Sequence, residues 1–393
     1  MNDKSHIRAL DGIRGLATVF VLLSHCYLMP ACFDPEPMKS MSGLRVLLFK
    51  SAELGWIGVD IFFVLSGFLI TRGLLQTRED PRYFRNFYAR RALRLLPLYY
   101  SLLAFYFLLA PFKHLPGSSY EFNAQNQGYY WFYLQNLLQV GDSIPTGELT
   151  HLWSLAIEEQ FYIYWPLALL LVPQRHHYRI ISAGLSVAVG TRMLSLAADN
   201  LHPHSMYVFT LARMDGIFVG ALLAMALSSA TPALIDHVRL IARRTFPLAS
   251  LVFVLSVVLA GHYAESFPVY ACDSMYLTLI QQVGFPALAL ATGSFVALTL
   301  LSAVPPLVQR IFESRVLVTI GKCSYGTFIL HPWLFGGLTA VGLGWSAFRG
   351  ILGDNLLADL VYMFCFIIVG FIPGWLTWTF FESRVLKLKD RFQ

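Results

Sequence analysis

The first apolar segment of the chain carries Arg14 and His25, two residues whose types could do chemistry. A charged group and a titratable group are costly inside membrane-spanning sequence, so their presence there indicates a function. On a helix these positions lie almost three turns apart, on one face, and about 16 Å apart along the axis. Asp11 and Thr18 fall on the same stripe. His25 titrates near neutral pH, which makes it the candidate general base or nucleophile.

Three carboxylates could orient that imidazole. Asp60 lies near the start of the second apolar segment, and Glu158 and Glu159 lie near the start of the fourth. A carboxylate beside an imidazole holds its orientation and stabilises its protonated form. We rank Asp60 and Glu158 equally for this role and Glu159 behind them. The alternative is that each carboxylate only neutralises a buried arginine: Arg14, Arg192 or Arg213.

The composition predicts an all-α, polytopic integral membrane protein. The 393 residues are 56% hydrophobic and 13% charged, with a mean hydropathy of +0.58, whereas soluble domains carry roughly 25% charge. The first helix is expected to serve as an uncleaved insertion signal. The five cysteines show no CxxC spacing, so we expect free thiols and no metal site. Residues 1–393 are expected to form a single membrane-embedded domain with a short basic tail at 382–393 and no appended soluble domain.

About ten apolar runs are long enough to cross a bilayer. They lie near 9–29, 56–71, 95–112, 152–172, 180–198, 206–228, 246–262, 275–301, 324–343 and 357–380.

Basic residues support this layout with both termini in the cytoplasm. That orientation places 22 of the 29 lysines and arginines in cytoplasmic segments and five in outer loops, as the positive-inside rule requires. The net charge of +6 therefore has a topological explanation, and no nucleic-acid partner is expected. His25, Asp60 and Glu158 all fall in the outer half of their spans. An aromatic cluster at 129–133 in a long outer loop favours an interfacial belt, with a sugar-stacking platform as the alternative.

Several motifs, in order, resemble those of the family-three membrane acyltransferases, and the resemblance covers essentially the whole chain. Arg14–x10–His25 resembles the signature of the first helix, and the run Gly58–Ile70 resembles that of the second. The remaining resemblances are Arg90–Pro97 to the basic loop, Trp153–Tyr162 to the fourth-helix motif, and Arg213–Asp215, Ser324–His331 and Phe381–Glu382 to looser marks. The chain departs from the pattern after Glu382 and after His331, away from the proposed chemistry.

The resemblance implies an O-acyltransferase of a bacterial plasma or inner membrane, with acyl-coenzyme A, most simply acetyl-coenzyme A, as donor and no permanently bound cofactor. Arg91 and Arg94, in a cytoplasmic run of arginines, are expected to grip its phosphates, because the guanidinium fork suits phosphate oxygens. The rest of the run is expected to anchor on anionic lipid. Ser66 could line an acyl passage or only bond a neighbouring helix. Arg14 and Glu159 complete the expected substrate-binding set.

The expected acceptor is a hydroxyl of a cell-surface glycan or lipid-linked glycan, such as O-antigen, exopolysaccharide or capsule. His25 would take the hydroxyl proton or carry the acyl group. A small-molecule or lipid acyltransferase is the alternative within enzymes. A transporter is less favoured, because transporters commonly show repeated halves with broken helices in matching positions, and this sequence shows no such symmetry.

Overall fold

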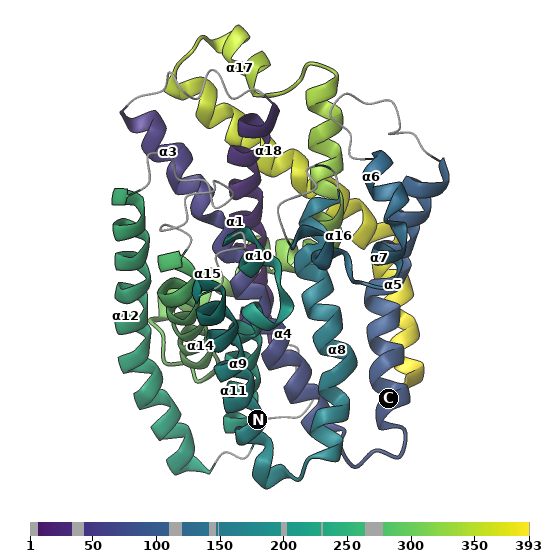
Figure 1. Ribbon diagram of the computed structural model, residues 1–393, viewed down its shortest axis with the longest axis vertical. Helices are drawn as coiled ribbons and strands as arrows, with labels where there is room; N and C mark the ends of the chain where they lie inside the picture. The colour runs from purple at the N-terminus through teal and green to yellow at the C-terminus, as the bar shows by residue number, and fades with distance from the viewer. Residues whose placement is uncertain are drawn as a thin grey trace. The chain divides into compact units, whose positions relative to one another are not determined.

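The computed structural model describes residues 7–33, 43–109, 120–140, 147, 149–197, 203–228, 231–263 and 278–392. Every regular element in these ranges is a helix or a helical turn (Figure 1), so the all-α prediction is confirmed for the described part of the chain. The chain divides into two compact units. The first holds residues 1–59, 92–121 and 310–391, and the second holds residues 60–91, 122–309 and 392–393.

Long helices from both ends of the sequence form the first unit. They are α1 (Arg8–Phe33), α3 (Leu44–Glu53), α16 (Arg315–Ala340), α17 (Trp345–Leu352) and α18 (Leu356–Thr377), with the second half of α5 (Tyr83–Leu109). The chain after α18 stays helical through a π-turn (Trp378–Glu382), α19 (Ser383–Leu386) and a 3₁₀ turn (Lys387–Phe392). The basic tail expected at 382–393 is therefore ordered helix through Phe392.

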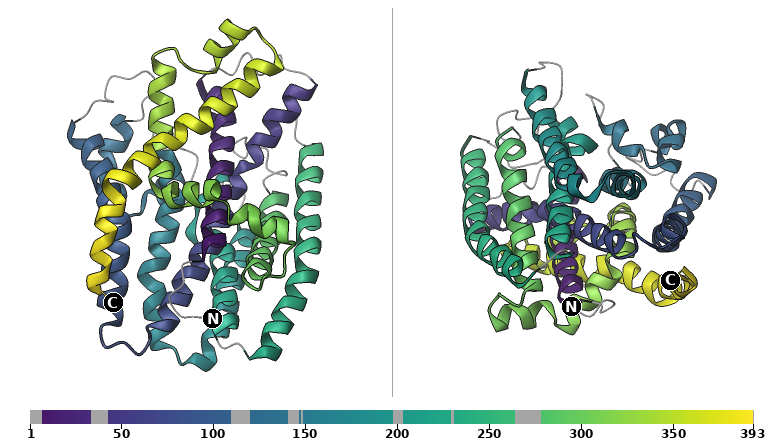
Figure 2. Two further views of the ribbon diagram at one scale, coloured as in Figure 1. Left: turned by 180° about the vertical axis from the view of Figure 1, so that it is seen from behind. Right: turned by 90° about the horizontal axis from the view of Figure 1, so that it is seen from below.

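Glycines on facing helices bring α1 and α16 into very close contact, side by side (Figure 2). A Cβ added at Gly15 would overlap the carbonyl oxygen of Leu317, and one at Gly12 would overlap that of Phe312, just before α16. From the other side, a Cβ at Gly321 would overlap the carbonyl oxygen of Asp11. Small residues that let backbones touch are the usual means of holding helices together in lipid, where apolar burial supplies little drive. We call this contact the α1/α16 seam.

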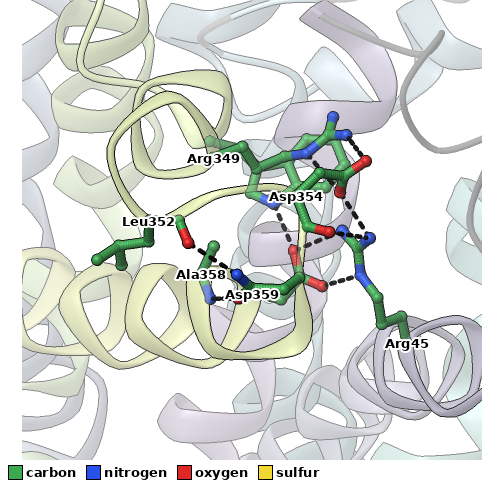
Figure 3. Close-up of polar contacts among 8 residues, drawn as sticks. Arg45, Arg349, Leu352, Asp354, Ala358 and Asp359 are labelled. Carbon is green, nitrogen blue, oxygen red and sulfur yellow. Dashed lines mark hydrogen bonds and ion pairs between the residues drawn. The ribbon is translucent and has the colours of Figure 1, made fainter.

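An ion-pair network ties α3 to α17 and α18 at one end of the first unit (Figure 3). Arg45 Nε lies 2.6 Å from Asp359 Oδ2, and Arg45 Nη1 lies 2.6 Å from Asp354 Oδ1. Arg349 binds the same Asp354 carboxylate, and Trp345 donates its indole N–H to Asp359 over 3.0 Å. The hydrogen bond from Arg349 lowers the pKa of the Asp354 carboxyl, and the bond from Arg45 lowers it further.

The second unit contains the helices from the middle of the sequence. They are α4 (Ile57–Gln76, from Asp60 on), α6 (Tyr120–Gln125), α7 (Gln127–Trp131), α8 (Trp153–Leu171), α9 (His177–Ala197), α10 (Pro203–Val208), α11 (Met214–Ser228), α12 (Pro232–Tyr263) and α14 (Phe285–Leu300). The residues of α15 (Pro306–Phe312) are divided, with 306–309 in the second unit and 310–312 in the first. α12 and α14 lie side by side (Figure 1).

A second glycine contact, the α4/α11 seam, lies in this unit. A Cβ at Gly67 would overlap the carbonyl oxygen of Ile217, and a Cβ at Gly220 would overlap that of Val64. Gly216 and Gly220 are four residues apart, the spacing that places two small residues on one helix face. The two seams thus use the same device in separate units.

Two expected helices differ from the structure near their starts. The span expected at 206–228 is broken: α10 ends at Val208, Phe209 is extended, and a 3₁₀ turn over Thr210–Arg213 precedes α11. Asn136 helps to hold this break, because its amide donates to the carbonyl of Val208 over 3.1 Å. The span expected at 275–301 starts outside the described residues, and its described part opens with a π-turn at Ile280–Gly284.

Each of the ten expected spans overlaps a long helix of the structure. In the described residues, six helices are both long and apolar enough to cross a membrane: Arg8–Cys26, Leu44–Gln76, Thr210–Ser228, Pro232–Ala260, Ile280–Leu300 and Leu356–Lys389. The chain is therefore a multi-pass membrane protein. Ten crossings and cytoplasmic termini stay predictions.

Candidate functional site

His25 occupies the C-terminal half of α1, and its ring is held by the helix itself. Its Nδ1 lies 2.8 Å from the carbonyl oxygen of Val21, one turn earlier. A carbonyl oxygen only accepts, so Nδ1 carries the proton and Nε2 presents a lone pair. The side chain is partly exposed, whereas Asp11 and Thr18 on the same helix are buried. This is the arrangement that a general base or an acyl-carrying nucleophile requires.

The imidazole of His331 lies against His25 within the first unit. The ring centroids are 4.7 Å apart, and the planes meet at 87°, an edge-on contact. His331 is fully buried on α16 and bonds the carbonyl of Thr327 through Nδ1 over 2.8 Å. In the sequence, His331 is the last residue of the looser motif Ser324–His331. The structure adds that it is a direct neighbour of the candidate base.

Glu53 is a buried carboxylate of the first unit that the sequence reading overlooked. It is the last residue of α3, which packs against α1, and its side chain is buried. Two residues later, a Cβ at Gly55 would overlap the carbonyl oxygen of Phe20. Glu53 therefore belongs to the segment that lies against the part of α1 preceding His25. A glutamate before an apolar run looks like a loop residue in the sequence, so only the packing brings it to notice.

Asp60 forms a buried ion pair with Arg213 in the second unit. Arg213 Nη2 lies 2.9 Å from Asp60 Oδ1 and 3.0 Å from Oδ2. Both side chains are almost wholly buried. Pairing with a buried arginine was the alternative for this carboxylate, and the structure shows that pair. A role for Asp60 in orienting His25 stays a prediction.

Aromatic rings surround the guanidinium of Arg213. Its Cζ lies 3.7 Å from the ring centroid of Phe285 and 5.0 Å from that of Tyr207, with Phe63 and Trp153 within 6 Å. An arginine over ring faces is stabilised by their quadrupoles, most strongly where water is excluded. The break before α11 places Arg213 in this aromatic cage.

A second buried ion pair lies nearby in the same unit. Arg192 Nη1 lies 3.1 Å from Asp215 Oδ2 and also donates to the carbonyl of Ala212. Arg192 is fully buried. The two arginines and two aspartates of this cluster neutralise one another, which is the condition under which buried charge is tolerated. Arg213 and Asp215, which belong to one of the looser motifs, are therefore both members of buried ion pairs.

Glu158 takes part in a different arrangement. The Tyr162 hydroxyl donates to Glu158 Oε2 over 2.6 Å, and it lies 3.1 Å from the hydroxyl oxygen of Ser66. The guanidinium carbon of Arg91 lies 4.9 Å from the centroid of the Tyr162 ring. We call these four residues the Tyr162 cluster. It brings together Ser66, Arg91 and Glu158, which the sequence nominated separately.

Glu159 lies beside this cluster and is buried. It is one position further along α8 than Glu158, so the two carboxylates leave the helix about 100° apart. Trp165 and Thr71 make a further link between α8 and α4, through an indole N–H bond of 2.8 Å. A second polar contact, beyond the Tyr162 cluster, therefore also holds α4 and α8 together.

Arg94 lies on α5 in the first unit, three residues after Arg91. The carbonyl of Leu95 next to it accepts a 2.6 Å bond from the buried hydroxyl of Tyr325 on α16. Glu382, at the end of the π-turn, accepts from Thr377 Oγ1 over 2.9 Å. π-turns occur mostly where function demands them, and this one keeps a carboxylate in the same unit as Arg94.

The aromatic cluster at 129–133 contains both buried and exposed side chains. Tyr130 is buried and donates its hydroxyl to Asn123 over 2.7 Å, whereas Phe132 is 75% exposed. Tyr133 has a positive φ of 55°, unusual for a bulky residue, and its carbonyl accepts from Gln160 over 2.9 Å. Both interpretations of this cluster, belt and platform, stay predictions.

The structure thus joins some nominated residues and not others. It joins Ser66, Arg91 and Glu158 through Tyr162, and it joins Asp60 to Arg213. His25 and Arg14 lie in the first unit, and all three carboxylates ranked for orienting His25 lie in the second. Sequence reasoning gave no role to Tyr162, although the residue ends the fourth-helix motif. A tyrosine one turn after a glutamate was the available signal.

The sequence matches one family model and several known proteins. A family model described as "Acyltransferase domain" matches residues 7–379. The chain is 26% identical over 386 residues to "Peptidoglycan O-acetyltransferase OatA" of Listeria monocytogenes, covering 92% of this chain and 55% of that protein. It is 28% identical over 381 residues to "Putative peptidoglycan O-acetyltransferase YrhL" of Bacillus subtilis strain 168, covering 91% and 54%. The chain spans about half the length of these relatives. No solved structure matches.

Proposed function

Since this chain belongs to the acyltransferase family whose domain spans residues 7–379, we propose that it is an O-acetyltransferase that moves an acetyl group from cytoplasmic acetyl-coenzyme A to a hydroxyl of a cell-surface glycan. The observation that carries this proposal is the state of His25, with Nδ1–H donated to Val21 and Nε2 able to take a proton. The membrane is the bacterial plasma membrane, crossed ten times with both termini inside.

The proposed chemistry uses His25 at the thioester. Nε2 of His25 removes the proton from the acceptor hydroxyl as that oxygen attacks the thioester carbonyl carbon. The carbon–sulfur bond breaks, and the proton on His25 passes to the departing thiolate, which leaves as the free thiol. Alternatively, Nε2 itself attacks the thioester carbonyl carbon and coenzyme A leaves as the thiolate; the acceptor hydroxyl then takes the acetyl group from Nε2, and its proton passes to the thiolate. Asp60 or Glu158 orients the imidazole in either route.

The Tyr162 cluster is the proposed end of the donor site. Arg91 is already fixed against the Tyr162 ring at 4.9 Å, so its fork loses little further freedom when it binds a phosphate. Arg94, three residues on, offers a second guanidinium from the same helix. Ser66 and Glu159 line the path of the acyl and pantetheine chain. Arg14 binds substrate on the stripe that leads to His25.

The acceptor is proposed as a glycan because the relatives named above are peptidoglycan O-acetyltransferases by name. Those relatives are about twice as long as the matched region, so their acceptor does not by itself assign the acceptor of this chain. O-antigen, exopolysaccharide, capsule and peptidoglycan share the chemistry that matters here, a sugar hydroxyl presented at the outer face.

The test is mass spectrometry and NMR of the host's surface glycans in three strains: gene deleted, gene restored, and gene restored as His25→Ala. We expect an O-acetyl signal that is lost on deletion, returns with the wild type and stays absent with His25→Ala. Removal of a general base lowers the rate by about 10²–10⁴-fold. Restoration with His237→Leu, which removes an exposed histidine on α12, is the control. An unchanged glycan in all strains would point to a small-molecule acceptor.

A further inference from the structure

We infer that His331 is a positioning residue for His25: the edge of one imidazole against the other fixes the direction in which Nε2 of His25 presents its lone pair. This inference rests on the proposed function, because it assigns a second residue to the same reaction. The rings meet at 87° with centroids 4.7 Å apart. A second ring at this distance limits how far the His25 ring can turn about its side-chain bond.

The His331 ring is itself held on every side that the structure describes. Its Nδ1 donates to Thr327 over 2.8 Å, and its relative exposure is 0%. The rings of Phe328 and Phe335 lie 6.3 Å and 6.4 Å from it. Phe335 in turn stacks on Phe366 of α18 with centroids 3.3 Å apart. His331 therefore transmits the rigidity of the α16/α18 packing to the His25 ring.

The α1/α16 seam sets the distance between the two histidines. The Gly15 and Gly321 contacts lie ten residues before His25 and His331 respectively. Each imidazole therefore lies about 15 Å along its own helix from the glycine contact, at a rise of about 1.5 Å per residue. The α1/α16 seam thus restricts the backbone that carries His25, and the contact with His331 restricts its side chain.

The electrostatic consequence favours the reaction. When His25 takes a proton, the resulting imidazolium lies within 4.7 Å of the centroid of a second aromatic ring. Aromatic rings attract cations, most strongly where water is excluded. His331 thus supports the protonated intermediate while it also limits the rotation of His25. Neither effect requires His331 to gain or lose a proton.

The experiment uses full-length protein in nanodiscs, with acetyl-coenzyme A as donor and N-acetylglucosamine oligosaccharide as acceptor. His331→Leu removes the ring, His331→Asn keeps a hydrogen-bond donor without a ring, and His331→Phe keeps a ring that cannot hold a proton. We expect the first two to lower kcat by about 100-fold, because small misplacement of a reacting group costs that much. KM for acetyl-coenzyme A should stay unchanged, and His331→Phe should retain most of kcat.

Nitrogen-15 NMR of labelled histidine gives a readout that needs no substrate. His25 should show a single Nδ1–H tautomer in the wild type and in His331→Phe, and exchange between tautomers in His331→Leu. Wild-type kcat and a single tautomer in His331→Leu would overturn the inference. So would His331→Phe as inactive as His331→Leu, which would make His331 an acid or base. Absence of acetyl transfer by the wild type would refute the proposed function, and the tautomer result would still decide the role of His331.

Discussion

The α1/α16 seam and the α4/α11 seam use one packing device for different ends. In each, a glycine on one helix touches a backbone carbonyl of the other. Ten residues along α1 and α16 from the glycines of the first seam lie two imidazoles, one of them partly exposed. Next to the second lie two buried ion pairs, Asp60–Arg213 and Arg192–Asp215. Close backbone packing makes a rigid frame, and the side chains beside it decide whether that frame holds a reactive group or a neutralised charge.

The largest effect is expected where the frame itself is disturbed. Gly321→Ala and Gly220→Ala each place a Cβ into a facing carbonyl oxygen, at Asp11 and Val64 respectively. Because the backbone cannot yield as a side chain can, we expect each to cost more than about 4 kcal/mol, an exceptional value for one methyl group. Thermal unfolding in nanodiscs would measure it. Gly337→Ala on α16, where a Cβ meets nothing within 4 Å, is the matched control.

The control should be neutral or slightly stabilising, because alanine is favoured over glycine in a helix by up to about 1 kcal/mol. If Gly321→Ala had the same melting temperature as Gly337→Ala, the α1/α16 seam would not be a rigid frame. The positioning of His25 would then need another cause.

The next effect concerns the buried charges of the α4/α11 seam. Arg213→Gln leaves Asp60 without its cation, and removal of one partner of a buried pair costs about 3–5 kcal/mol. The double variant Asp60→Asn with Arg213→Gln carries no net charge and should recover most of that loss. Thermal unfolding of the wild type, of Arg213→Gln and of the double variant would measure this loss and its recovery.

Activity of the double variant then sharpens the comparison. Recovered folding with recovered acetyl transfer would show that Asp60 serves only to neutralise Arg213. Recovered folding without transfer would support the predicted role of Asp60 toward His25. The corresponding change beside the first seam, His25→Ala, should leave folding intact and remove transfer.

A smaller effect is expected at the Tyr162 cluster. Tyr162→Phe keeps the ring against Arg91 and removes the hydroxyl that bonds Glu158 at 2.6 Å. A hydrogen bond to a charged group contributes about 1.5–3 kcal/mol, so we expect kcat to fall by about tenfold or more if Glu158 takes part in the chemistry. Steady-state kinetics with acetyl-coenzyme A would show it. Tyr164→Phe, on an exposed face of the same helix, is the matched control.

The outcome separates the parts of that cluster. A raised KM for acetyl-coenzyme A with normal kcat would assign the cluster to donor binding alone. An unchanged kcat and KM would exclude both roles for the Tyr162 hydroxyl.

The smallest effect is expected at the half-exposed network of Figure 3. Arg349 and Arg45 lower the pKa of Asp354 from its usual value of 3.8. A carboxyl with a lowered pKa in the folded state stabilises the protein above about pH 4, and that stabilisation is lost as the pH falls through the lowered pKa. The side chain of Asp354 is 50% exposed, so solvent screening limits the effect to less than about 1 kcal/mol.

Thermal unfolding of Asp354→Asn and of the wild type between pH 7 and about pH 3 tests this. The wild type should be slightly more stable at pH 7, and the difference should shrink as the pH falls. A constant difference would mean that the carboxylate charge does not stabilise the network. The larger stability loss expected for Arg213→Gln would then be explained by the burial of its ion pair alone.

Local sequence patterns predicted the helices well and their interruptions poorly. Each expected span overlaps a helix, because long apolar runs have few other conformations available in lipid. The break before Met214 and the π-turn at Ile280–Gly284 were not predicted. The break serves Arg213, whose partners lie on α4 and α14, far away in sequence. Hydropathy carries no trace of such distant contacts.

The candidate site was predicted in part for a similar reason. His25 stood out, because a titratable residue in an apolar helix is costly wherever it lies. Tyr162 and His331 did not, since neither is charged at neutral pH by type and each lies in the middle of an apolar helix. Their significance arises from contacts with Glu158 and His25 respectively.

The sequence by itself determined that this is a helical membrane protein, that it carries a polar stripe from Arg14 to His25, and that its motifs are those of an acyltransferase. Those properties follow from local composition and spacing, which every copy of the chain carries before it folds. Only the tertiary structure decided which charge pairs with which, that glycine backbones meet in two seams, and that His331 lies edge-on to His25. Such pairings depend on distances between residues hundreds of positions apart, and packing alone sets those distances.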